Sequence, residues 1–226
     1  MEDFELFKKN ELKSRDDTFT FDCAMCGDCC RNRREAILIN GADIFRMAKA
    51  LNVTMKEYIR KNTVGYLGSD SHVPVLVLKE RPDGSCPMLR KGKCMVQSVK
   101  PAVCALFPLG RYHDVRDHSM HYFRNPYGCE GCKAKRVWTL GEWIDTFKLE
   151  TTADMTTAWM DMLMGISKRT SRMKAENISE EMCVAMAAVL YFNYDTSRDF
   201  LEQVEENKAD IQKVFQTKFG IKIEFE

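Results

Sequence analysis

The stretch Cys23-Ala-Met-Cys26-Gly-Asp-Cys29-Cys30 decides how this chain folds, because half of its eight residues are cysteines. Two residues between thiolates form a tight turn that points both sulfurs at one centre, and Gly27 permits the backbone angles of such a turn. We therefore expect Cys23, Cys26 and Cys29 to bind at one metal site. The adjacent Cys30 directs its side chain differently from Cys29, so one of the two either serves a second site or is a spare thiol.

Five further cysteines lie in the middle of the chain, namely Cys86, Cys94, Cys104, Cys129 and Cys132. We expect all nine to be metal ligands, divided as four, four and one, and their spacing leaves the pairing open. Two features favour an iron–sulfur cluster of the 4Fe–4S type. One is three consecutive ligands with a distant fourth, and the other is Cys86 followed by Pro87. A zinc site, which typically takes two ligands from each of two CxxC knuckles, is the alternative.

Composition limits the classes of protein to which the chain can belong. Its 226 residues are 45% hydrophobic and 30% charged, which excludes a disordered or collagen-like chain. The 34 basic side chains nearly balance the 33 acidic ones, so we expect no nucleic-acid partner, and no membrane partner. Since no apolar run resembles a signal peptide or membrane span, we expect a cytoplasmic protein, whose reduced cysteines bind metal rather than form disulfides.

Sequence patterns predict an α+β fold. Apolar spacing and capping signals predict two short helices after Asn40, a strand at 73–78, and a hairpin whose turn is at Lys91-Gly92-Lys93. Four helices are expected at 138–147, 153–167, 180–194 and 197–215, and a last strand at 221–225. We expect an irregular metal-organised cysteine-rich core with a small sheet, wrapped by helices and followed by a helical C-terminal half. The domains would be an N-terminal helical arm at 1–18, a cysteine-cluster domain at 19–134 and a helical region at 135–226 packed on it.

Several other features have an ordinary structural interpretation beside a functional one. Cys183 lies among apolar residues of a predicted helix, so we expect it in the core rather than at a metal. His113, His118 and His121 fit a polar loop or hairpin better than a metal site. Cations flank the cysteine motifs: Arg31, Arg33, Arg34, Arg90, Lys91, Lys93, Lys100 and Arg111. They either stabilise the negative charge of a thiolate-bound metal, receive an anionic substrate, or form a solvated surface.

The cysteine motifs together resemble a known family. The CxxCxxCC run, Cys86 with Cys94, and the stretch Lys100-Pro-Ala-Val-Cys104-Ala-Leu-Phe-Pro108 are similar to the YkgJ-like family of zinc- or iron-chelating cysteine clusters. The resemblance covers about residues 19–134 and implies metal binding. The same domain resembles the cysteine-rich part of flagellin lysine N-methylases, so a protein-modifying enzyme is a further alternative. No catalytic residue, substrate or physiological partner is evident from the sequence.

Overall fold

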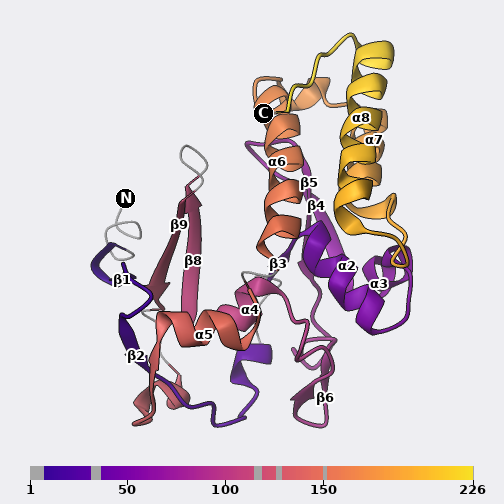
Figure 1. The fold of residues 1–226 in the computed structure, drawn as a ribbon. Coiled ribbons are helices and arrows are strands. Elements are labelled where there is room, and N and C mark those ends of the chain that lie inside the picture. Colours follow the sequence, from indigo (N-terminus) through magenta and orange to yellow (C-terminus); the bar gives the residue numbers. More distant parts are fainter. Residues whose placement is uncertain (1–7, 32–36, 115–118, 126–128, 150–151, 226) are drawn as a thin grey trace.

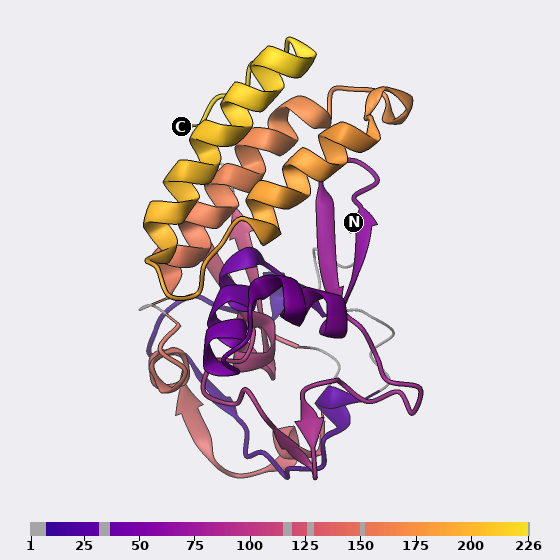
Figure 2. The same cartoon turned by 90° about the vertical axis from the view of Figure 1, so that its right-hand side faces the viewer.

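The upper part of the molecule packs helices on a small sheet (Figures 1 and 2). The computed structural model describes residues 8–31, 37–114, 119–125, 129–149 and 152–225. The upper helices are α2 (Gly41–Ala50), α3 (Met55–Asn62), α6 (Ala153–Thr170), α7 (Glu180–Ala187) and α8 (Phe200–Phe219), and a π-helical turn, Ala188–Phe192, extends α7. The sheet is antiparallel, in the order β3 (Leu38–Ile39), β5 (Pro74–Leu78), β4 (Thr63–Leu67). These elements confirm the predicted helices and the predicted strand near 73–78.

Local signals in the sequence fix where α2 and α3 begin. The side chain of Asn40 accepts from the Asp43 N–H at 2.7 Å and so caps α2. Thr54 and Glu57 form a capping box at the start of α3, as their spacing predicts. Each cap satisfies backbone N–H groups that would otherwise lack a partner at a helix start.

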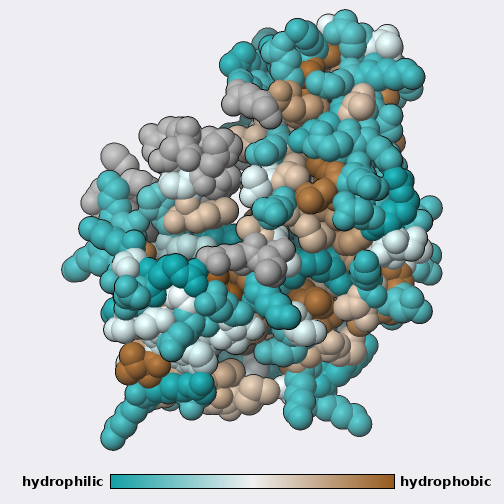
Figure 3. Space-filling model, viewed as in Figure 1, coloured by the Kyte–Doolittle hydropathy of each residue, from teal (hydrophilic) through white to brown (hydrophobic). Residues whose placement is uncertain are grey.

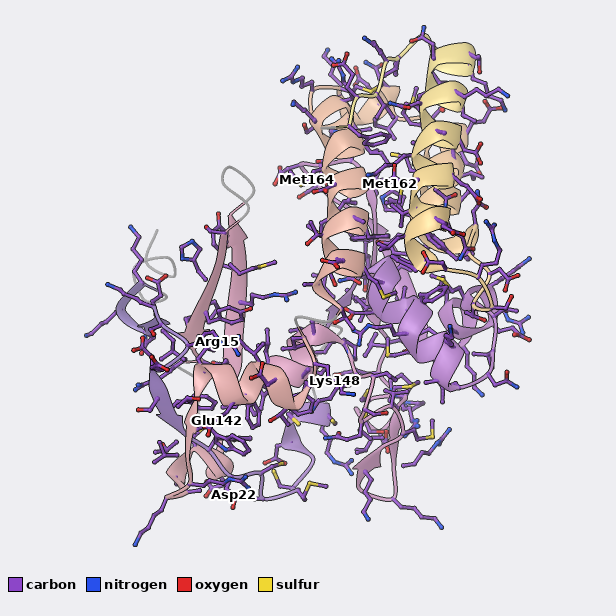
Figure 4. All side chains as sticks on the ribbon, in the orientation of Figure 1. Arg15, Asp22, Glu142, Lys148, Met162 and Met164 are labelled. Atoms are coloured by element: carbon purple, nitrogen blue, oxygen red, sulfur yellow. The ribbon has the colours of Figure 1, made fainter. Side chains whose placement is uncertain are left out.

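One large buried cluster, core 1, joins the two halves of the chain. It combines residues between 39 and 96 with residues between 159 and 223. Met47, Met162, Ile166, Leu190 and Phe215 are completely buried in it. Met162 lies between α6 and α8 whereas Met164 points outward (Figure 4). Met47 and Met162 therefore fill core positions, whereas Met164 lies on the outer face of α6.

The lower part of the molecule has its own buried cluster, core 2 (Figure 1). Its elements are two antiparallel sheets, β1 (Glu11–Leu12)–β9 (Ser119–Arg124)–β8 (Leu109–Asp114) and β10 (Val137–Thr139)–β2 (Thr18–Thr20), and two helices, α4 (Ala102–Leu106) and α5 (Leu140–Thr146). The indole ring of Trp143 meets the rings of Phe19 and Phe21 edge-on, with centroids 5.7 and 5.4 Å apart. Such edge-to-face pairs are the preferred aromatic geometry.

The cysteine-bearing segments connect these two parts with little regular structure. They contain the 3-10 turns η1 (Asp28–Cys30) and η2 (Glu130–Lys133) and a hairpin of β6 (Leu89–Arg90) and β7 (Lys93–Cys94). Lys91 and Gly92 both have positive φ, as the predicted turn requires. The α+β prediction and the irregular character of this region therefore agree with the structure.

Three details of the prediction are wrong. The described residues form four small sheets rather than one. The stretch 221–225 forms no strand, because Ile223 inserts into core 1 and Phe225 packs so tightly on α6 that a Cβ at Gly165 would lie 2.4 Å from its ring. The predicted helical arm, 1–18, is helical at Lys8 and Lys9, but Glu11–Leu12 and Thr18 form strand, since these pair with β9 and β10. Residues 1–7 of the arm lie outside the described residues.

The surface is largely hydrophilic on the face drawn in Figure 3, with apolar residues showing between the upper helices and in smaller patches over the lower part. In the part of the chain that the structure describes, no helix combines the length and the apolar character needed to cross a bilayer.

Candidate metal centre

Five cysteines from three segments come together beside α4, and we call them the first thiol group. They are Cys29 and Cys30 of η1, Cys86 and Cys94 of the hairpin region, and Cys104 of α4. The sulfurs of Cys29 and Cys30 are 3.8 Å apart, and the Cys86 N–H donates to the Cys30 carbonyl at 2.8 Å. Cys30 interacts electrostatically with Cys86 and Cys104, and Cys94 with Cys29. Residues separated by up to 75 positions therefore lie within electrostatic reach of one another.

Backbone pairing holds these segments in register. Arg31, directly after η1, forms an antiparallel bridge with Ser85, directly before Cys86. Leu89 pairs with Cys94 across the β6–β7 hairpin, and its N–H donates to the Cys86 carbonyl at 3.0 Å. The tight turn at Cys86 and the following hairpin thus place both thiols on the same side.

Backbone amides are directed at the sulfurs of this group. The N–H groups of Met88 and Leu89 donate to the Cys86 sulfur, and the N–H of Val96 donates to the Cys94 sulfur. Amides that donate to sulfur stabilise thiolates and are a recognised feature of cysteine-bound metal centres. This arrangement prepares Cys86 and Cys94 to act as ligands.

The surroundings of Cys30, Cys86, Cys94 and Cys104 keep these four thiols protonated without a metal. Burial raises the pKa of Cys104 to about 12, and the neighbouring Cys86 adds to the rise. The pKa of Cys30 is raised by its hydrogen bond with Cys29 and by burial. Burial likewise raises the pKa of Cys86 and of Cys94. A metal bound here would replace protons and supply the positive charge that the deprotonated group lacks.

Two cations lie against the first thiol group. Arg81 donates to the Leu89 carbonyl at 2.8 Å and to the Pro87 carbonyl, so it fixes the Cys86 turn. Lys100 lies 4.2 Å from the centre of the Phe147 ring, and its charge favours the thiolates of Cys94 and Cys104. Lys100 was among the predicted cations but Arg81 was not. Arg81 is five residues before the nearest cysteine, and only its reach back over the turn reveals its role.

The other predicted cations are distributed differently. Arg31 is exposed, and Arg33 and Arg34 lie outside the described residues. Arg90, Lys91 and Lys93 are exposed on the hairpin. Arg111 interacts electrostatically with Asp43. Among the described residues, the charge beside these thiols therefore comes mainly from Arg81 and Lys100.

A buried carboxylate joins the first thiol group to core 1. Asp43 of α2 pairs with Arg46 and accepts from the Ala102 N–H at 3.3 Å, at the start of the helix that carries Cys104. Burial raises the pKa of Asp43, and the Arg46 guanidinium opposes that rise. The sequence gives no local sign of this role, because the partner of Asp43 lies 59 residues away.

The remaining four ligand candidates are Cys23, Cys26, Cys129 and Cys132, and we call them the second thiol group. The sulfurs of Cys129 and Cys132 are 3.8 Å apart on η2 and pack against core 2. Cys23 and Cys26 are exposed in the loop that follows β2. That Cys23, Cys26 and Cys29 bind at one metal site stays a prediction.

Full coordination geometry is not assembled in the part of the chain described. No three His, Cys, Asp or Glu side chains among those residues are placed to hold one metal ion. The donor set nevertheless fits a thiophilic metal, since nine thiols lie in two groups with amides directed at several sulfurs.

The other residues considered as ligands lie elsewhere. His121 on β9 bonds to Glu11 at 2.7 Å and to Ser119 at 2.8 Å. It belongs to a polar hairpin surface, as predicted; the backbone of His113 lies in β8, and His118 is outside the described residues. Cys183 is half-buried against core 1, in agreement with its predicted packing role.

Comparison with known proteins gives one match. The family model named CxxCxxCC and described as "Putative zinc- or iron-chelating domain" matches residues 22–134, which is half of the chain. No curated protein matches the chain, and no solved structure matches it. The matched range contains every cysteine of both thiol groups.

Proposed function

We propose that this chain, which belongs to the CxxCxxCC family of zinc- or iron-chelating domains, holds a 4Fe–4S cluster on its first thiol group. Membership of this family indicates that the chain binds metal. Which metal it binds, and what role the metal has, are our proposal. The observation that carries it is the convergence of Cys29, Cys30, Cys86, Cys94 and Cys104 from three segments of the chain.

The environment of these thiols suits a cluster better than an exposed single ion. Four thiolates around an oxidised cube leave about two negative charges, which need amides and cations nearby. The amides at Cys86 and Cys94 and the side chains of Arg81 and Lys100 supply both. Four of the five thiols are half-buried, which limits solvent access and tunes reduction potential.

The chemistry that such a group supplies is one-electron transfer. We propose that the protein uses it for electron transfer, redox work or support of an enzyme, in the cytoplasm. This chain's own residues would hold the group, offset its charge and shield it on the core 1 side through Tyr58 and Met88, which are both buried. Residues 19–134 would form the metal-binding domain, and 135–226 would pack on it.

Anaerobic purification followed by iron, sulfide and zinc analysis tests the proposal. We expect a brown protein whose iron is lost in Cys86→Ser and retained in Cys183→Ser, a matched substitution of a thiol that packs on core 1. Colourless protein in which the first thiol group carries zinc would refute the iron–sulfur proposal and leave a zinc-chelating module. Tight binding of S-adenosylmethionine would favour the methylase alternative.

A further inference from the structure

We propose that the second thiol group is a separate metal site, in which Cys23, Cys26, Cys129 and Cys132 hold one Zn(II) ion. The inference rests on the proposed function only in assigning iron to the other thiols. It divides the nine clustered cysteines into two chemically different centres. The family's alternative metals, zinc or iron, would then both be present in one chain.

The backbone brings the two CxxC segments to the same place. Strands β2 and β10 pair with Thr20 opposite Val137, and hydrogen bonds continue beyond them. The Phe21 N–H donates to the Arg136 carbonyl at 2.9 Å, and the Asp22 N–H donates to the Gly131 carbonyl at 3.0 Å. The residue before Cys23 is therefore bonded to the residue before Cys132.

Contact between these segments is close as well as hydrogen-bonded. A Cβ added at Gly131 would lie 2.6 Å from the Asp22 carbonyl oxygen and 2.8 Å from the Phe21 ring. Only glycine allows these two segments of the chain to approach this closely. The glycine inside the second CxxC is thus explained by the position of the first.

Each segment has the local form of a metal knuckle. The Cys129 and Cys132 sulfurs are 3.8 Å apart, and the N–H groups of Gly131 and Cys132 donate to the Cys129 sulfur. In the other segment, Gly27 has φ 77° directly after Cys26, so the chain turns sharply there. Two CxxC knuckles that supply two thiolates each are the usual ligands of structural zinc.

The second thiol group packs on a different core from Cys86 and Cys94 of the first. Cys129 and Cys132 pack against core 2, whereas Cys86 and Cys94 pack against core 1. Cys23 and Cys26 are exposed, so their side chains can turn toward η2 without loss of packing. Binding would replace four thiol protons by one Zn(II) ion, giving a tetrahedral site of charge −2.

The test compares metal contents of the full-length protein purified anaerobically with both metals supplied. We expect about one zinc per chain. Cys23→Ser and Cys26→Ser should lose this zinc and keep their iron, while Cys86→Ser should keep zinc and lose iron. Because Cys23 and Cys26 are exposed, these substitutions remove no core contact, and circular dichroism would check that the helices packed on core 1 remain folded. Cys183→Ser is the control for loss of any thiol.

X-ray absorption at the zinc edge gives an independent readout, with four sulfurs at about 2.3 Å expected in the wild type. Zinc retained in Cys23→Ser, Cys26→Ser and Cys129→Ser would overturn the inference, as would zinc lost only in Cys86→Ser. If iron is absent from every preparation while these three variants still lose zinc, the proposed function fails and the second site stands.

Discussion

The two thiol groups show how one cysteine-rich sequence can build two different environments. The first thiol group is mostly half-buried, lies beside core 1 and is accompanied by Arg81 and Lys100. In the second, Cys23 and Cys26 are exposed, and the other pair packs on core 2. The number of thiols is similar in both groups. Burial, nearby cations and the number of converging segments distinguish them, so these properties rather than cysteine spacing should decide which metal each binds.

Removal of all metal should produce the largest effect. We expect the segments around both thiol groups to lose protection in hydrogen exchange, because binding free energy of about 10–16 kcal/mol for structural zinc substitutes there for burial. Helices α6 and α8, whose inner faces are buried in core 1, should keep their protection. Equal protection in metal-free and metal-loaded protein would show that neither group depends on metal for its structure.

Substitution of Asp43 should have the next largest effect. Asp43→Ala leaves Arg46 buried without its partner, which typically costs about 3–5 kcal/mol in unfolding free energy. Urea denaturation would measure it. We also expect iron to fall and zinc to stay, since the Asp43 contact lies at the start of α4. Asp43→Asn retains an acceptor for the Ala102 N–H and should cost less. An equal loss of both metals would contradict the separation of the two groups.

Arg81→Gln should have a moderate effect limited to the first thiol group. It removes donors from the carbonyls of Pro87 and Leu89, for which about 1–3 kcal/mol is typical. We expect lower iron retention during dialysis and unchanged zinc. Arg90→Gln, on the exposed end of the same hairpin, is the control. If both variants release iron equally, general loss of positive charge rather than the Arg81 contacts is responsible.

Cys183→Ala should have the smallest effect. Its side chain is half-buried against core 1, so we expect less than about 1 kcal/mol of destabilisation and no change in either metal. Thermal unfolding together with metal analysis would check this. A substantial fall in metal content would place Cys183 among the ligands.

Local patterns predicted much of the fold, and long-range contacts account for what they missed. The capping box at Thr54 and the turn at Lys91 and Gly92 depend on residues within four positions, and both appear as predicted. Residues 221–225 alternate between apolar and charged side chains, a local pattern that predicts a strand. Ile223 instead packs in core 1, and the stretch joins no sheet.

For the candidate site, too, long-range contacts account for what local patterns missed. Motif spacing identified all nine cysteines as candidates but not their grouping, because the grouping depends on pairings such as Arg31 with Ser85 and Asp22 with Gly131. These pairings join residues 54 and 109 positions apart along the chain. Arg81 was missed for the same reason, since its contacts are set by the fold of the Cys86 turn.

The hydrogen bond from the Trp138 indole to the Phe21 carbonyl, 2.9 Å long, gives the protein an optical reporter. Phe21 is two residues before Cys23, and Trp138 also stacks edge-on with Trp143. Fluorescence from these two indoles therefore senses order in the loop that begins at Cys23. Trp159 is buried in core 1, where its indole donates to the Leu190 carbonyl, and so emits from the other part of the fold. Replacing Trp159 with Phe would leave emission only from the lower part, so metal exchange there could be followed in real time without any added dye.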